Sequence, residues 1–181
     1  MRPVAACARP DRPHLCDQYL HRFSGLEPGD LEPSTSTHYL ISTKTAYMKL
    51  RYLIDIGCVF VGHGLKQDFR MLNIVVPPEQ VIDTVELFSF KHKRKLSLRF
   101  LAAYLLGVDI QKDTHDSIED ARTALALHRA YEKLSAGGAA RFRDTLDEIY
   151  RYGYRNHFQI QEAIPEEIAA ALSRPGPAST V

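Results

Sequence analysis

A short apolar run between two glycines is the feature that most constrains how this chain can fold. Residues 58–61 are continuously apolar and are bounded by Gly57 and Gly62, which is typical of a strand buried on both faces of a parallel sheet. Residues 66–73 then have the pattern of a helix, and residues 81–85 have that of a second short strand. The order strand, helix, strand indicates a right-handed parallel crossover. We therefore expect an α/β fold.

The helical patterns elsewhere define one domain. We expect helices over residues 14–23, 43–56, 96–106 and 117–134, because apolar residues recur there at helical spacing and Gly57 and Gly107 follow as C-terminal stops. Residues 1–13 contain three prolines and no periodicity, so we interpret them as a disordered leader. We place the domain at residues 14–150 and interpret residues 151–181 as a partly disordered tail.

The composition limits the classes of function. A net charge of +1 gives no global attraction for polyanions, so nucleic-acid binding would depend on a local patch and on metal. The three cysteines are odd in number and form no Cys-x-x-Cys pair, which argues against a disulfide framework and a cysteine zinc site. A reducing compartment, cytosol or nucleus, fits best. No apolar run approaches the roughly 20 residues that span a bilayer, so we expect no membrane partner.

The first candidate for chemistry is Asp68. It follows the first predicted strand and the turn that contains Gly62 and Gly64, which places it near the carboxyl end of that strand, where α/β sheets build their sites. An acid in the first turn of a helix also complements the helix dipole, worth about 0.3 to 1 kcal/mol, and this structural explanation is sufficient for Asp68 taken alone.

The second candidate pairs His115 with Asp120, five residues later. Ser117 and Asp120 also fit a capping box, and a histidine outside regular structure is commonly just exposed. The combination with Asp68 changes the balance, because cleavage by two divalent metals needs oxygen ligands from several elements and a group that deprotonates water. Histidine suits that second role with its pKa of about 6.5.

A basic loop forms a third candidate. Residues 91–95 carry four permanent positive charges, among them Lys93 and Arg94. Such a loop can hold a nucleic-acid backbone, although most runs of this kind are solvated surface segments.

Four segments together carry a family resemblance: residues 62–70, Asp83-Thr84, residues 97–101 and residues 115–125. They resemble the second and third motifs of the ribonuclease-T-like DEDDh exonucleases. Within that family they are most similar to the exonuclease domains of catalytic subunits of poly(A)-nuclease deadenylation complexes, and residues 24–31 and 50–57 support the narrower assignment. The resemblance covers about residues 15–150.

The resemblance implies a ribonuclease-H-like fold and a 3′–5′ exoribonuclease that shortens messenger poly(A) tails and releases AMP. By position, Asp68 and Asp120 would hold two divalent cations, Mg²⁺ or alternatively Mn²⁺, and His115 would be the general base. His63 and Leu65, with Lys93 and Arg94, would contact the substrate. The implied partners are single-stranded RNA, a poly(A)-nuclease regulatory subunit and poly(A)-binding protein, in the cytoplasm, in P-bodies or in the nucleus.

One family element has no counterpart in the sequence. The family's first motif is a strand bearing Asp-x-Glu. The sequence does contain Asp30-Leu31-Glu32, but this string lies between Gly29 and Pro33 and cannot be the interior of a central strand. We therefore expect an N-terminally truncated domain that is inactive by itself and marginally folded, because the first strand would lack a neighbour.

Two alternatives stay open. Beside the poly(A)-specific exoribonuclease, one alternative is another DEDDh exonuclease that acts on other RNA or on single-stranded DNA. The other is a non-catalytic fragment that binds single-stranded RNA or a partner subunit.

Overall fold

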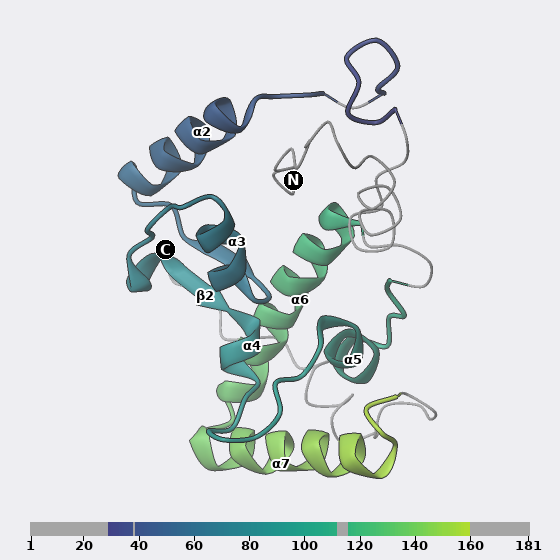
Figure 1. The fold of residues 1–181 in the computed structure, drawn as a ribbon. Helices are drawn as coiled ribbons and strands as arrows, with labels where there is room; N and C mark the ends of the chain where they lie inside the picture. Colours follow the sequence, from purple (N-terminus) through teal and green to yellow (C-terminus); the bar gives the residue numbers. More distant parts are fainter. Residues whose placement is uncertain (1–28, 38, 112–115, 160–181) are drawn as a thin grey trace. The chain divides into compact units, whose positions relative to one another are not determined.

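The computed structural model describes residues 29–37, 39–111 and 116–159 (Figure 1). Its helices and strands, in chain order, are α2 (Thr43–Asp55), β1 (Phe60–Gly62), α3 (Leu65–Met71), β2 (Val81–Asp83), α4 (Thr84–Leu87), α5 (Leu98–Leu101), α6 (Ser117–Ser135) and α7 (Ala139–Arg155). A 3₁₀ turn, η1 (Pro78–Gln80), precedes β2, and a π-helical turn, η2 (Ala102–Leu106), continues α5. The leader, the predicted helix 14–23 and His115 lie outside the described residues.

The described residues divide into two compact units. The first contains residues 29–60, 65–81, 111 and 116–119, and the second contains residues 61–64, 82–110 and 120–159. The boundary passes through both strands and through the first turn of α6, so each unit is discontinuous in sequence.

The first unit is thinly packed. Ile54 is the one buried residue of α2, and the side-chain amide of Gln80 donates a hydrogen bond of 3.1 Å to the Ile54 carbonyl. Phe60 and Phe69 meet edge to face with their ring centroids 5.7 Å apart. Several large apolar side chains of this unit are exposed, among them Tyr39, Met48, Tyr52, Val59, Met71 and Val75. Asp30 and Glu32 lie in the turns that precede α2, as predicted for loop residues.

The second unit holds the hydrophobic core. Leucines and aromatic rings from α5, η2, α6 and α7 form one buried cluster whose least exposed members are Phe88, Leu101, Leu105, Ile110, Leu127, Ile149 and Tyr150. Figure 1 shows α7 running across the end of α6, where residues 136–138 make the turn between them. Apolar residues of α7 at positions 142, 146, 149 and 150 recur at three- and four-residue spacing and therefore face this core.

The two strands pair as predicted, but they are shorter than expected. β1 and β2 form a two-stranded sheet, and the strand, helix, strand order confirms the α/β class. The expectation of a strand over residues 58–61 buried on both faces was wrong: β1 begins at Phe60, Val59 is 52% exposed and only Gly62 in the strand is buried. A strand in a two-stranded sheet of this small size lacks the covering layers that bury both faces. β2 ends at Asp83 instead of residue 85, because the Asp83 side chain caps α4.

Most of the predicted helices are present in the structure. α2, α3 and α6 lie where the periodicity predicts them. The α6 amide of Ile118 is capped by the Asp116 carboxylate at 2.8 Å, so an acid one residue before Ser117 does the capping there. α7 was not predicted, and it runs through the proposed boundary at residue 150 as far as Arg155. No helix in the described ranges has the length and hydropathy needed to cross a bilayer.

Candidate functional site

Asp68 lies in the first turn of α3, directly after the sharp turn at Gly64, whose φ is 82°. Its side chain is exposed. The residue belongs to the first unit. The local structure therefore matches the sequence prediction of an accessible carboxylate at the start of a helix that follows a strand.

Asp120 lies in the first turn of α6 and is half-buried. It belongs to the second unit. Burial lowers the pKa of His63, and the negative charge of Asp120 is among the effects that oppose this lowering. Because Asp68 belongs to the other unit and His115 lies outside the described residues, the convergence of the three groups stays a prediction.

The donor chemistry of these acids suits a hard divalent cation, which prefers carboxylate oxygens. The described ranges contain no group of three or more His, Cys, Asp or Glu side chains placed to hold a metal ion. The carboxylates in these ranges are the type of ligand that Mg²⁺ prefers, but no three of them lie close enough together to hold one ion.

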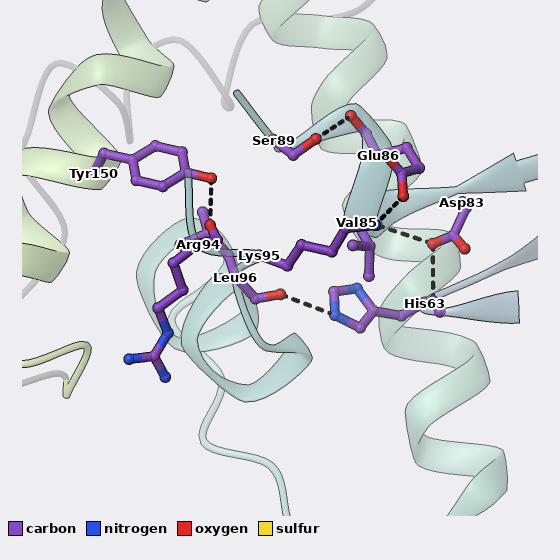
Figure 2. A network of polar contacts seen from close by, with 10 residues as sticks. His63, Asp83, Val85, Glu86, Ser89, Arg94, Lys95, Leu96 and Tyr150 are labelled. Carbon is purple, nitrogen blue, oxygen red and sulfur yellow. Dashed lines mark hydrogen bonds and ion pairs between the residues drawn. The ribbon is translucent and has the colours of Figure 1, made fainter. Parts of the chain in front are cut away.

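His63 is held at both ring nitrogens, and Figure 2 shows the contact with the Leu96 carbonyl. Nδ1 lies 2.9 Å from the Thr84 hydroxyl and Nε2 lies 3.1 Å from the Leu96 carbonyl. Burial lowers the pKa of His63, against the raising effects of the Asp83 charge, the Leu96 carbonyl and the Asp120 charge. The ring therefore ties β1 to the end of β2 and to the segment before α5, and both of its polar atoms are engaged inside the protein.

Asp83 and Thr84 complete this network, and residue patterns alone did not assign them a role. One Asp83 carboxylate oxygen accepts hydrogen bonds from the amides of Gly64 at 2.8 Å and Val85 at 3.0 Å. The fully buried Thr84 hydroxyl donates to the Gly62 carbonyl at 2.9 Å. The signal was available, because Asp83 followed three residues later by Glu86 is an N-cap pattern.

Leu65 begins α3 and is half-buried. It belongs to the first unit, whereas His63 belongs to the second. The structure does not test whether either residue contacts a substrate.

The basic loop is fixed to the rest of the second unit by several contacts. The Lys93 ammonium lies 3.4 Å from the Asp147 carboxylate and over the rings of Phe90 and Tyr150, at 4.5 and 5.0 Å from their centroids. The Tyr150 hydroxyl donates a 2.7 Å hydrogen bond to the Arg94 carbonyl (Figure 2). The loop is therefore a structured segment whose backbone is anchored on α7.

The charges of the loop are not equivalent. Lys95 forms an ion pair with Glu86, and the hydrogen bond to that carboxylate is the main reason that the pKa of Lys95 is raised. Arg94 instead places its guanidinium carbon 4.5 Å from the centroid of the Phe158 ring. Lys93 and Lys95 thus pair with carboxylates, whereas the Arg94 guanidinium contacts the Phe158 ring.

Comparison with known proteins identifies the family of this chain. The RNase_T family model, described as an exonuclease, matches residues 2–128. The chain belongs to the RNase_T exonuclease family. The resemblance predicted from the motifs is thus confirmed, whereas the roles of Asp68 and Asp120 stay predictions.

The relatives narrow the position within the family. A catalytic subunit, PAN2, of the PAN2-PAN3 deadenylation complex from Gallus gallus is 52% identical over 146 residues, covering 80% of this chain and 12% of the relative. The corresponding subunit from Schizosaccharomyces pombe is 54% identical over 142 residues, covering 78% of this chain and 13% of the relative. The chain therefore spans only about an eighth of the length of these relatives.

Solved structures confirm the fold. The Saccharomyces cerevisiae Pan2 pseudoubiquitin hydrolase and RNA exonuclease module in complex with AAGGAA RNA aligns with a TM-score of 0.73 at 47% identity, covering 79% of this chain and 23% of that chain. The Neurospora crassa Pan2 catalytic unit, with protease and nuclease domains, gives a TM-score of 0.69 at 55% identity, covering 73% and 22%. The chain has the ribonuclease-H-like fold of these exonuclease modules.

Proposed function

We propose that this chain is a poly(A)-specific 3′–5′ exoribonuclease domain that acts in messenger poly(A) tail shortening. The observation that carries the proposal is the identity of about half the residues with deadenylation catalytic subunits over four fifths of the chain. A structural relative at 47% identity is a module solved with RNA. Because the chain spans a small part of each relative, activity, substrate and partners are proposals for this chain.

The site residues have the following proposed roles. Asp68 and Asp120 provide carboxylate oxygens toward divalent metal, Mg²⁺ or Mn²⁺, and His115 accepts the proton of the water that attacks the phosphodiester. Metal bound there would supply electrostatic stabilisation of the phosphate charge that develops during cleavage. Cleavage of the last phosphodiester leaves a 3′ hydroxyl on the shortened strand and releases AMP.

The proposed partners follow from the relatives. A PAN3-type regulatory subunit is the protein partner that the names of the relatives indicate. Poly(A)-binding protein, the poly(A) tail and a cytoplasmic location that includes P-bodies, with the nucleus as the alternative, are extensions of the same proposal.

The test is hydrolysis of labelled oligoadenylate by the whole 181-residue chain with Mg²⁺ and with EDTA. Because the acids of the first family motif have no counterpart in the sequence, we expect at most weak Mg²⁺-dependent release of AMP from the 3′ end, faster from oligoadenylate than from a mixed-sequence RNA. Asp68→Asn and Asp120→Asn should each abolish it, whereas Asp144→Asn, an exposed acid on α7, should not. Undiminished cleavage by Asp68→Asn contradicts the assignment of the site.

The second candidate function is RNA binding without cleavage. The observation that favours it is the lack of a three-ligand metal group within the described ranges. A binder should hold oligoadenylate at every Mg²⁺ concentration and release no AMP, so the same assay separates the two functions.

A further inference from the structure

Aromatic rings gather at the C-terminal end of α7. Tyr154 lies 6.3 Å from Tyr150 and 5.2 Å from Phe158, measured between ring centroids. Tyr150 is buried, whereas Tyr154 is 56% exposed, the largest exposure of any aromatic side chain in the described part of the second unit. A large aromatic surface is thus offered to solvent beside a rigid aromatic layer.

Phe158 is fixed in place by the backbone. Its amide donates a 2.6 Å hydrogen bond to the Gly153 carbonyl, and its φ is 59°. Its ring occupies the space that a side chain at Gly153 would need, since a Cβ there would lie 2.5 Å from the ring. The ring also meets Phe100 edge to face at 5.4 Å. Little conformational entropy is therefore lost when a ligand contacts this layer.

Arg94 adds a positive charge to the same surface. Its guanidinium lies over the Phe158 ring at 4.5 Å, and no carboxylate within the described residues forms an ion pair with it. Its main chain is held by the Tyr150 hydroxyl. The exposed Arg151 lies beside Tyr154 on α7, because residues three apart on a helix are neighbours on its surface.

Exposed aromatic faces combined with unpaired cations are the features by which proteins bind single-stranded nucleic acid, because bases stack on the rings while cations follow the phosphates. We infer that Tyr154, Phe158 and Arg94 form a stacking platform for single-stranded RNA, a surface that engages the substrate strand in addition to the cleavage site. The inference rests on the proposed function and identifies a second contact for the same substrate.

The stacking platform also changes the roles proposed for the residues of the basic loop. Lys93 and Lys95 act within the fold, through Asp147 and Glu86, and Arg94 is the loop residue that lies on the platform, over the Phe158 ring. Loss of the Arg94 side chain keeps the Tyr150 hydrogen bond, which uses the main-chain carbonyl. An Arg94→Ala chain should therefore keep the loop in place and lose only the guanidinium.

The experiment measures binding without hydrolysis. Fluorescent oligoadenylate is titrated with the full chain in EDTA, and an oligoadenylate that carries 2-aminopurine reports stacking through fluorescence quenching. We expect Tyr154→Ala and Arg94→Ala each to weaken binding roughly tenfold, in line with the effect of removing one stacking partner. Tyr154→Phe, which keeps the ring, should bind and quench normally. Arg143→Ala is the charge-matched control, 11 residues earlier on α7 and about 16 Å along its axis.

Each outcome decides the inference. Equal affinity and quenching in Tyr154→Ala and in the unmodified chain overturns the inference, as does a loss in Arg143→Ala equal to that in Arg94→Ala. No RNA binding by the unmodified chain overturns it as well. Loss of binding in the two platform variants, with no Mg²⁺-dependent cleavage by the unmodified chain, supports the platform while the proposed exonuclease activity fails.

Discussion

The hydroxyl of Tyr150 donates a 2.7 Å hydrogen bond to the main-chain carbonyl of Arg94, 56 residues earlier in the chain. This contact joins a loop rich in positive charge to the helix α7, whose apolar residues form part of the core. The position of the loop therefore depends on a helix that the sequence patterns did not single out.

Tyr150→Phe should lower the free energy of unfolding by about 0.5 to 1.5 kcal/mol, because the Arg94 carbonyl loses its donor while packing in the core is kept. Urea denaturation followed by circular dichroism measures the change. Tyr154→Phe is the matched control, and with its exposed ring it should change stability by less than about 0.5 kcal/mol. Equal effects of the two substitutions would show that the Arg94 hydrogen bond does not stabilise the fold.

Gly153→Ala should destabilise the chain, although alanine is the better helix former. The added Cβ would lie 2.5 Å from Phe158 and 3.2 Å from Phe100, and overpacking of this kind costs about 1 to 3 kcal/mol against a gain in helix propensity of about 1 kcal/mol. Phe158→Leu removes the ring that causes the clash, so Gly153→Ala should cost less in that background. A higher melting temperature for the single Gly153→Ala variant would contradict the close approach.

Thr84→Val should cost about 1 to 3 kcal/mol, because it removes the hydroxyl from a fully buried position where the Gly62 carbonyl and His63 both use it. Thr84→Ser keeps the hydroxyl and loses one methyl group, worth about 0.8 kcal/mol. Chemical denaturation of the two variants should rank valine as the less stable. The reverse order would mean that methyl packing outweighs the hydrogen bonds at this position.

The stability of the chain should depend on pH through His63. Burial lowers the pKa of His63 in the folded chain below its ordinary value of 6.5, so the unfolded chain binds more protons and stability rises with pH. The contribution is complete above the unfolded pKa and is lost as pH falls from about 6.5 through the lowered folded pKa. The free energy of unfolding should fall less steeply below about pH 6.5 in His63→Asn than in the unmodified chain. Identical slopes would exclude His63 as the titrating group.

His115→Ala should reduce Mg²⁺-dependent cleavage of oligoadenylate by about 10² to 10⁴-fold, the usual effect of losing a general base. Single-turnover kinetics measure the cleavage step apart from RNA binding, which should stay unchanged. His128→Ala, on α6, is the control and should cleave normally. Full cleavage by His115→Ala would assign the base to another group.

Much of the fold could be predicted because some helices carry local signals. Ser42 and Gly57 flank α2 as a cap and a stop, and α6 begins at Ser117 as its periodicity indicates. α7 was missed because its apolar face is diluted by arginines and acids and interrupted by Gly153, although Leu146, Ile149 and Tyr150 are regularly spaced. The end of β2 was misplaced because residues 81–85 were interpreted as one strand, although Asp83 with Glu86 three residues later is an N-cap pattern. The structure shows the cap as a hydrogen bond from the Val85 amide to the Asp83 carboxylate.

Only part of the candidate site could be predicted from the sequence. Asp68 and Asp120 stand in the first turns of helices as predicted, because helix starts are local events. The partners of His63 could not be foreseen, since Thr84 and Leu96 are 21 and 33 residues away and meet it only through the fold. The same holds for Lys93, whose pairing with Asp147 removes it from the set of available cations.

The π-helical turn η2 places one extra residue in the helix that continues α5, and the chain leaves it through Gly107 with φ of 67°. Deleting a single residue between positions 102 and 106 would restore a regular helix, but it would rotate everything downstream by about 100° around the axis. Ile110, which is 1% exposed, would then no longer point into the hydrophobic core. Packing of the core therefore constrains the number of residues in this π-helical turn as well as the side chains that surround it.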